Sequence, residues 1–409
     1  MKAPELRRYQ SDGVARLREI LSSRGAAILA DEPGLGKTAQ ALAVARAEGC
    51  RSVLVVCPAS LRANWRRESA LWWPGGSVDV MSYEGAVKAS GDLCGPFAYD
   101  LAVFDEAHYL KSREARRTKA CLSVAARKRL YLTGTPVVNR PVELWPILSS
   151  MGLAGGYVEF GKRYCAGYLR RIGRRRVWDF TGASNTEELR EILSGVMVRR
   201  LKADVLSELP AKTRQAVALD MASGESAGYR AAMVPWLKAG LLGEAPPPVD
   251  FAAVSLERQR CGLAKAPRVA ALARDILEEE DALVVMAYHR AVMDVLAREF
   301  SAYSPVMVRG GMSDAEKDAA VRAFQSGRSR VFIGQLQAAG TGLTLTAART
   351  LLFAEMDWSP GVMTQAEDRI HRIGQTCPVR IIHAAAEGSV DLMLAQALFD
   401  KQAVLDGIL

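Results

Sequence analysis

The sequence has few cysteines and histidines, and they are not arranged as metal ligands. Seven cysteines are scattered over 409 residues without a Cys-x-x-Cys pair, and the four histidines do not cluster with them. This spacing argues against a structural zinc site and indicates reduced thiols. No apolar run approaches membrane-spanning length, and the N-terminal residues lack a hydrophobic signal core. We therefore expect no membrane partner and no secretion, and a cytoplasmic location, nucleoid-associated if the source is bacterial or phage.

The composition is that of a globular protein with a basic surface. Hydrophobic residues make up 49% of the chain and charged residues 24%. A length of 409 residues suits two domains of ordinary size better than one. The formal net charge of +9 favours a polyanionic partner without identifying it, because ribosomal, membrane-surface and solubility explanations fit the same value.

Short apolar runs alternate with helical stretches in two separate sets, which predicts two α/β lobes with parallel sheets. The first set of expected strands comprises residues 26–30, 53–57, 78–81, 101–104 and 130–132. The second set comprises residues 283–288, 306–308, 331–333, 351–354 and 379–383. We predict a first lobe at 1–215, a linker region at 216–260 and a second lobe at 261–409. A basic, aromatic stretch at about 146–210 breaks the alternation and predicts a helical or irregular insertion protruding from the first lobe.

A glycine-rich loop at residues 30–38, with sequence ADEPGLGKT, lies between an expected strand and an alanine-rich helix. In that order the backbone amides of Gly34, Leu35 and Gly36 and the helix N-terminus surround a phosphate chain. Lys37 would reach the β- and γ-phosphates, and the Thr38 hydroxyl would hold Mg²⁺. The loop departs from the strict pattern, because Asp31 replaces the first glycine and Pro33 has no amide hydrogen.

Two carboxylates, Asp105 and Glu106, follow the expected strand at 101–104. The carboxyl edge of a parallel sheet is where such folds bind ligands. Asp105 could hold Mg²⁺ through its water shell, and Glu106 could orient and deprotonate an attacking water. A solvated acidic turn is the alternative interpretation.

The segment 365–375, with sequence QAEDRIHRIGQ, predicts a cationic helix face. If 365–373 is helical, Gln365, Arg369 and Arg372 follow i, i+4, i+7 spacing and share one face. Two guanidinium groups suit a γ-phosphate, because they stabilise the charge that develops as it leaves. The alternative is a solvated helix in which Glu367 and Asp368 pair with the arginines.

The order of these motifs resembles the superfamily 2 helicase-like ATPases, and the resemblance covers nearly the whole chain. The motifs lie at residues 6–10, 34–38, 105–108 (DEAH), 132–136 (LTGTP), 340–343 (GTGL) and 365–375. Residues 30–38, 357–360 and 365–375 look like the Swi/Snf branch. Residues 163–165, 182–189 and 197–210 are similar to its annealing-helicase (HARP-like) subgroup. The resemblance implies two tandem RecA-like lobes, an ATP site in the cleft between them, and ATP and Mg²⁺ as cofactors.

The resemblance also assigns roles to residues by position. It implies nucleotide contacts at Arg8, Gln10, Gly342 and Gln365, coupling residues at His108, Thr133 and Thr135, and arginine fingers at Arg369 and Arg372. It implies nucleic-acid contacts at Pro58, Ser60, Asn64, Arg309, Gly310, Gly340, Thr341 and Trp358. Trp65 is either a further contact or a core residue. Pro33 departs from the family's usual methionine, and we expect no fork-binding accessory module beside the motor.

We therefore expect a DNA-dependent ATPase that translocates on duplex DNA, with forked or branched duplexes as candidate substrates. It would be a monomeric motor recruited by separate proteins, which remodels DNA or protein–DNA complexes in repair, replication or recombination. An RNA-directed DEAH-type helicase and a catalytically silent DNA-binding scaffold are the alternatives. The sequence offers no candidate for a strand-separating wedge, so translocation without unwinding is expected.

Overall fold

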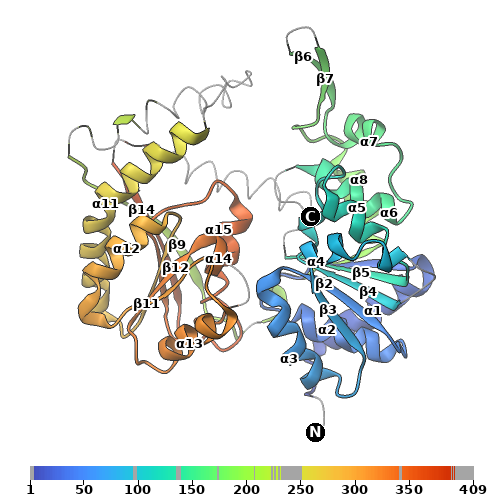
Figure 1. The fold of residues 1–409 in the computed structure, drawn as a ribbon, viewed down its shortest axis with the longest axis horizontal. Coiled ribbons are helices and arrows are strands. Elements are labelled where there is room, and N and C mark those ends of the chain that lie inside the picture. Colours follow the sequence, from blue (N-terminus) through green and yellow to red (C-terminus); the bar gives the residue numbers. More distant parts are fainter. Residues whose placement is uncertain are drawn as a thin grey trace. The chain divides into compact units, whose positions relative to one another are not determined.

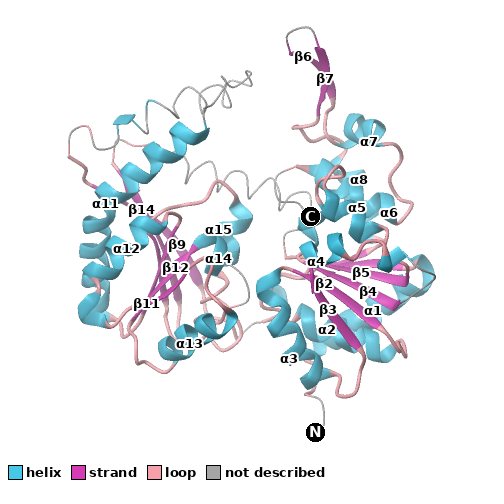
Figure 2. Cartoon of the chain, in the orientation of Figure 1, coloured by secondary structure: helices cyan, strands magenta, loops and turns pink. Residues whose placement is uncertain are grey.

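The computed structural model describes residues 4–94, 99–134, 140–172, 175–206, 208–222, 224, 227–228, 231, 251–339, 343–387, 389 and 391. The chain divides into two compact units (Figures 1 and 2). Unit 1 comprises Met1–Ser207 with Ala403–Leu409, and unit 2 comprises Glu208–Gln402. No helix in the described part of the chain is both long enough and apolar enough to cross a membrane.

Unit 1 is built on a six-stranded parallel sheet of order β3-β2-β4-β5-β1-β8. The strands are β1 (Ala26–Leu29), β2 (Val53–Cys57), β3 (Val78–Ser82), β4 (Tyr99–Asp105), β5 (Ala126–Leu132) and β8 (Met197–Val198). Every residue of β1 and β2 is buried, as expected of central parallel strands covered on both faces. The surrounding helices are α1 (Arg8–Arg24), α2 (Lys37–Ala47), α3 (Arg62–Trp72), α4 (Tyr83–Lys88) and α5 (Arg116–Leu122).

The predicted insertion in unit 1 contains both helices and a two-stranded antiparallel hairpin. Its helices are α6 (Trp145–Ser150), α7 (Tyr157–Tyr164), α8 (Thr186–Ser194) and α9 (Lys202–Val205). Between α7 and α8, strand β6 (Tyr168–Ile172) pairs with β7 (Arg175–Asp179). Figure 1 shows this hairpin projecting from the helical part of unit 1, away from the parallel sheet. The insertion was predicted to be helical or irregular. The structure shows an antiparallel hairpin in addition to the helices.

Unit 2 contains a second six-stranded parallel sheet, of order β11-β12-β10-β13-β14-β9. Its strands are β9 (Lys212–Leu219), β10 (Leu283–Ala287), β11 (Val306–Val308), β12 (Val331–Gln335), β13 (Thr350–Phe353) and β14 (Val379–Ala386). Its helices are α11 (Phe251–Glu279), α12 (Arg290–Glu299), α13 (Asp314–Gln325), α14 (Leu336–Ala339) and α15 (Pro360–Glu367). The predicted fold class, with two RecA-like α/β lobes, is confirmed.

The boundary between the units differs from the predicted one at residue 215. Strand β9 pairs with β14 over its whole length, from Lys212 opposite Val379 to Leu219 opposite Ala386. It therefore belongs to unit 2. Because β9 is an edge strand with mostly exposed residues, it lacks the continuous apolar run that revealed the other strands. The predicted linker at 216–260 also contains the start of the 29-residue helix α11, and most of the rest lies outside the described residues.

Candidate active site

The loop between β1 and α2 can take its observed path because it contains two glycines in the left-handed region. Gly34 has φ 92°, and Gly36, the N-cap of α2, has φ 77°. A side chain is disfavoured at such angles, and a Cβ on Gly36 would also collide with the side-chain amide of Gln10. The loop therefore brings bare backbone to the N-terminus of an 11-residue helix, where the helix dipole and unpaired amides favour an anion.

Lys37 lies over this loop, close to the end of β5. Its Nζ donates to the Asp31 carbonyl oxygen at 2.7 Å. A Cβ placed on Gly134 would come within 3.4 Å of that Nζ and within 2.6 Å of the Pro33 ring. Thr38 follows in the first turn of α2 and is half-buried. An ammonium group, a helix N-terminus and a glycine loop together form a donor set that fits a polyphosphate.

The start of α1 packs against the same loop. The Gln10 side-chain amide donates to the Leu35 carbonyl at 3.1 Å, and the Tyr9 hydroxyl donates to the same oxygen at 3.2 Å. The other end of the Gln10 amide accepts from the Arg7 backbone N–H at 2.9 Å. Gln10 is buried, whereas Arg8 is exposed. The predicted nucleotide residue Gln10 therefore lies beside the phosphate loop and also fixes its shape.

Arg200 holds the beginning of the loop, a contact that the sequence analysis missed. Its Nε donates to Asp31 Oδ1 at 3.0 Å and its Nη2 to Asp31 Oδ2 at 2.5 Å, a side-on bidentate pair with a fully buried carboxylate. The same Nη2 donates to Gln40 Oε1 at 2.6 Å, and Nη1 bonds the Tyr9 carbonyl. The available signal was Asp31 itself, because a buried carboxylate at a glycine position requires a cationic partner.

The residues around Arg200 bond the loop a second time through the backbone. The Glu32 amide donates to the Arg200 carbonyl at 3.1 Å, and the Glu32 carboxylate accepts from the Lys202 amide. Strand β8, which ends two residues before Arg200, pairs with β1. The segment 197–202 thus fixes both the strand that leads into the loop and the first two loop residues.

We expect Arg200→Met to raise the KM for ATP and to destabilise unit 1. Removing the guanidinium leaves the Asp31 carboxylate buried without its cation, a loss typically of about 3–5 kcal/mol. Arg200→Lys keeps the charge but not the planar fork, so it should restore stability more than KM. Thermal melting and steady-state ATPase kinetics measure the two effects. Unchanged KM in both variants would show that the pair stabilises the fold alone.

The two carboxylates of the DEAH segment lie at the end of β4, as predicted. Asp105 Oδ2 accepts from Trp65 Nε1 at 2.7 Å, and Oδ1 accepts from the Glu106 amide at 3.0 Å. Burial and the adjacent Glu106 charge raise the pKa of the Asp105 carboxyl, while the Trp65 hydrogen bond and Lys37 oppose the rise. Carboxylate oxygens are the ligands that Mg²⁺ prefers, so Asp105 suits a divalent cation. Trp65 was interpreted either as a nucleic-acid contact or as a core residue. It is 1% exposed and is therefore a core residue.

Glu106 adopts a backbone conformation that non-glycine residues seldom use. Its φ is 53°, in the left-handed region, a strain of the kind found at functional sites. His108 Nδ1 lies 3.3 Å from Glu106 Oε2, so the predicted coupling histidine touches the predicted base. The end of β5 brings in buried Thr133, whose amide donates to the Leu29 carbonyl at 3.0 Å. Thr135 lies outside the described residues.

In unit 2 the condition that 365–373 is one helix is not met, because α15 ends at Glu367. The Arg369 carbonyl accepts from the Leu345 amide at 2.9 Å, so it does not continue the helical ladder. Glu367 turns toward β9 and pairs with Lys212 at 2.9 Å and Arg214 at 2.6 Å. Glu367 is therefore salt-bridged, as in the alternative interpretation, but to Lys212 and Arg214 of β9.

The two arginines nevertheless come together. Arg369 Nη1 donates to the Leu343 carbonyl at 3.3 Å, and Arg372 Nη1 donates to the same oxygen at 3.1 Å. Arg369 Nε also donates to the Gln365 carbonyl at 2.8 Å. Gln365, Arg369 and Arg372 are thus gathered around one loop by turns rather than by a helix face. Gly342, which immediately precedes Leu343, lies outside the described residues.

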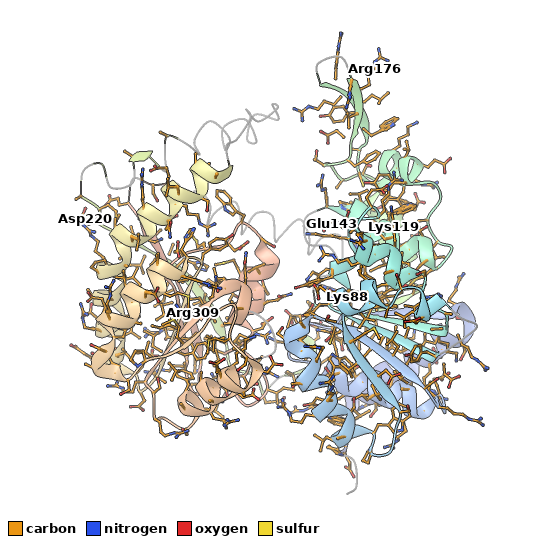
Figure 3. All side chains as sticks on the ribbon, viewed as in Figure 1. Lys88, Lys119, Glu143, Arg176, Asp220 and Arg309 are labelled. Atoms are coloured by element: carbon orange, nitrogen blue, oxygen red, sulfur yellow. The ribbon has the colours of Figure 1, made fainter. Side chains whose placement is uncertain are left out.

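The predicted nucleic-acid contacts that the structure describes follow strands of both sheets. Pro58, Ser60 and Asn64 follow β2, and Asn64 Oδ1 accepts from Arg67 at 2.6 Å. In unit 2, Arg309 is partly exposed and pairs with Asp294 at 3.0 Å (Figure 3). The Gly310 amide donates to Gln335 Oε1 at 2.8 Å.

Three further predicted contacts also belong to unit 2. Trp358 is half-buried, with the Arg258 guanidinium carbon 5.8 Å from its ring centroid. Gly340 and Thr341 lie outside the described residues. All of these contacts stay predictions.

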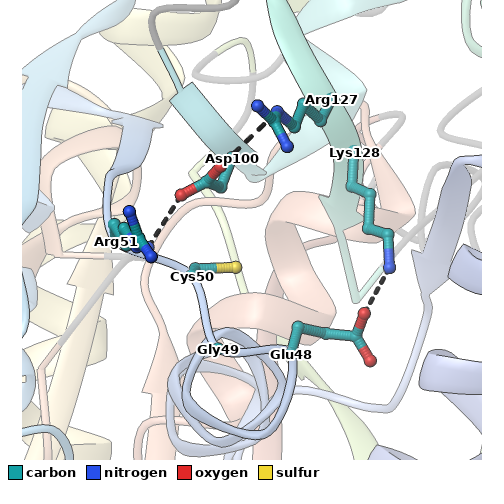
Figure 4. Close-up of a pocket in the computed structure, with 7 residues that line it drawn as sticks. All are labelled: Glu48, Gly49, Cys50, Arg51, Asp100, Arg127 and Lys128. Carbon is teal, nitrogen blue, oxygen red and sulfur yellow. Dashed lines mark hydrogen bonds and ion pairs between the residues drawn. The ribbon is translucent and has the colours of Figure 1, made fainter.

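A polar cavity in unit 1 is separate from this site. It has a volume of about 470 Å³ and is lined by Glu48, Gly49, Cys50, Arg51, Asp100, Arg127 and Lys128 (Figure 4). These residues lie at the amino ends of β2, β4 and β5, whereas the DEAH segment lies at the carboxyl ends. Burial raises the pKa of the Cys50 thiol to about 11, so this cysteine is a poor nucleophile at neutral pH.

Comparison with known proteins identifies the family. The model of the SNF2-related domain matches residues 9–93 and 80–245, and that of the helicase conserved C-terminal domain matches residues 267–374. Mus musculus DNA annealing helicase and endonuclease ZRANB3 is 34% identical over 98% of this chain and 40% of its own length. A second relative is Xenopus tropicalis SWI/SNF-related matrix-associated actin-dependent regulator of chromatin subfamily A-like protein 1. It is 34% identical over 97% of this chain and 44% of its own length.

A solved structure, the Sulfolobus solfataricus SWI2/SNF2 ATPase core in complex with dsDNA, is 23% identical. It aligns over 99% of this chain and 93% of that chain, with a TM-score of 0.47. The chain spans less than half the length of the two curated relatives named above. The predicted Swi/Snf resemblance is confirmed by the family models and these relatives. The chain therefore belongs to the family of proteins with an SNF2-related domain.

Proposed function

We propose that this protein is a DNA-dependent ATPase that translocates on duplex DNA and remodels DNA structures or protein–DNA complexes. The observation that carries the proposal is the convergence of Lys37, Thr133 and the Asp105–Glu106 pair at the carboxyl ends of β1, β5 and β4. These are the groups that phosphoryl transfer to water requires. A scaffold that had lost catalysis would not need them, so the geometry favours an enzyme.

ATP with Mg²⁺ is the cofactor that the donor set favours, and it would supply the phosphoryl group for hydrolysis. Lys37 and the α2 N-terminus would bind the phosphates, and Thr38 and Asp105 would hold the cation. Glu106 would orient and deprotonate the attacking water. Arg369 and Arg372 would stabilise the charge that develops on the leaving phosphate, as arginine fingers do.

Duplex DNA is the partner that the relatives and the charge support. The mouse relative is named a DNA annealing helicase, and this chain carries a net charge of +9. Because phosphate contacts bind any sequence, a motor can move along DNA without reading bases. We infer a monomeric motor acting in repair, replication or recombination. We expect the predicted contacts at Pro58, Ser60, Asn64, Arg309 and Gly310 to follow the backbone.

The decisive experiment compares ATP turnover without nucleic acid and with single-stranded DNA, duplex DNA, forked DNA and RNA. We expect duplex and forked DNA to stimulate hydrolysis more than single strands or RNA do. Stronger stimulation by RNA would assign the chain to RNA-directed helicases, and no turnover under any condition would make it a scaffold. Displacement of a third strand from a triplex, beside displacement of a strand from a tailed duplex, then tests whether movement occurs without unwinding.

A further inference from the structure

The β6–β7 hairpin exposes apolar and cationic side chains together. Tyr168 is 56% exposed, Leu169 49% and Val177 47%, in a unit whose other large apolar side chains are mostly buried. Arg171, Arg175 and Arg176 are also exposed, and Figure 3 shows Arg176 on the projecting hairpin. Apolar side chains that are exposed in a group generally mark a binding surface.

The pairing register distributes both kinds of side chain over both faces of the hairpin. Side chains alternate along a strand, and Leu169 lies opposite Trp178 while Arg171 lies opposite Arg176, so these share one face. Arg170 lies opposite Val177 on the other face, which also carries Tyr168. Leu169, Arg171 and Arg176 are exposed on the first face and Tyr168 and Val177 on the second, whereas Trp178 and Arg170 are half-buried. The hairpin therefore presents a mixed surface on both sides rather than an amphipathic one.

The base of the hairpin is anchored by side-chain contacts. Trp178 stacks on Phe180 with ring centroids 5.9 Å apart, and Lys162 Nζ lies 4.7 Å from the Trp178 centroid. Arg170 pairs with Asp179 at 3.6 Å. These contacts fix the direction in which the hairpin projects and hold the neighbouring exposed side chains, Tyr168, Leu169 and Val177, in place.

The charge of the hairpin selects a polyanion. Asp179 is its one acidic residue and already pairs with Arg170. Among the described residues, neither Arg175 nor Arg176 has an ion-pair partner. Such a cationic surface complements phosphates, but phosphates offer nothing to Tyr168 or Leu169. Apolar and aromatic side chains find partners in nucleic acids where bases are unstacked or unpaired.

We propose that the β6–β7 hairpin binds the branch point of branched duplex DNA. Its arginines hold the phosphates, while Tyr168, Leu169 and Val177 contact the unpaired bases there. This inference rests on the proposed function and narrows its substrate from duplex DNA to branched DNA. It is consistent with a motor that does not unwind a plain duplex, because the bases at a branch are already accessible.

The test uses two hairpin variants and one matched control in the full chain. The apolar variant combines Tyr168→Ala, Leu169→Ala and Val177→Ala, and the charge variant combines Arg171→Gln, Arg175→Gln and Arg176→Gln. The control is Leu256→Ala, which removes an apolar side chain that is 48% exposed on α11. Binding of a three-way junction and of linear duplex of equal length is measured by fluorescence anisotropy without ATP, with melting temperatures as a check of folding.

We expect the apolar variant to lose about tenfold or more in affinity for the junction, the effect of about one stacked base, and to bind linear duplex normally. The charge variant should weaken both complexes and flatten their salt dependence. 2-Aminopurine placed at the branch should change fluorescence with the wild type and the control, but not with the apolar variant.

Wild-type binding that is equal for junction and linear duplex would overturn the inference. Junction affinity that the apolar variant leaves unchanged would do the same, and would assign the exposed surface to a protein partner. Both outcomes are independent of the ATPase assay, in which duplex-stimulated hydrolysis tests the proposed function separately.

Discussion

We expect Glu106→Gln protein to bind ATP normally and to lose almost all hydrolysis. The amide is nearly isosteric with the carboxylate but cannot accept the proton of the attacking water. General-base catalysis typically contributes about 10²–10⁴-fold, so turnover should fall by that factor in the presence of duplex DNA. Steady-state turnover and nucleotide binding are the two measurements. Glu19→Gln, at a residue that is 66% exposed on α1, is the matched control.

Lys37→Ala supplies the contrasting result. Lys37 lies over the phosphate loop, so its removal should weaken ATP binding itself, whereas Glu106→Gln should leave binding intact. If Glu106→Gln retains turnover within a few-fold of the wild type, the base lies elsewhere and the strained position of Glu106 has another cause.

The second large effect concerns the arginines of unit 2. We expect Arg372→Ala to reduce turnover by about a thousandfold or more, the scale of an arginine finger. Arg372→Lys should rescue little, because an ammonium cannot present the planar fork of a guanidinium. Arg328→Ala, at an exposed arginine that donates to Ser326 at 3.2 Å, removes the same charge from unit 2 without touching the Leu343 loop.

Comparison with Arg369→Ala tests whether the two arginines act together. Both donate to the Leu343 carbonyl, so we expect the double variant to lose little more than either single variant. Near-normal turnover of Arg372→Ala would contradict the assignment. Effects of the two single variants that multiply would show that each arginine contributes independently.

The sheets were predictable from the sequence because their central strands are buried on both faces. Strand β2, with sequence VLVVC, has no polar residue. A run of this kind is typical of a short strand that is buried on both faces. Strand β9 escaped prediction for the opposite reason. Its residues are largely exposed, and what makes it a strand is its pairing with β14, more than 150 residues later in the chain. Long-range pairing of this kind leaves no local pattern.

The candidate site shows the same division between local and distant causes. The glycine loop and the DEAH pair were predictable, because the loop conformation and the strand end dictate residue types at adjacent positions. The contact between Arg200 and Asp31 joins residues 169 positions apart, so spacing could not reveal it. The end of α15 was missed because the Arg369 carbonyl, which would continue the helix, accepts instead from the Leu345 amide. Leu345 lies 24 positions earlier in the chain, so the local sequence does not show this contact.

The position of β9 decides how the two halves of this protein can be produced separately. A C-terminal half that starts at residue 216 would carry only the second half of β9, and would uncover the β14 edge opposite Lys212–Gln215. An uncovered edge strand invites pairing between copies and aggregation. A half that starts at Glu208 retains the complete strand, and an N-terminal half that ends at Ser207 retains Arg200 and Lys202 with their loop contacts. The soluble expression of either half thus depends on eight residues that the sequence pattern assigned to the end of one lobe and a linker.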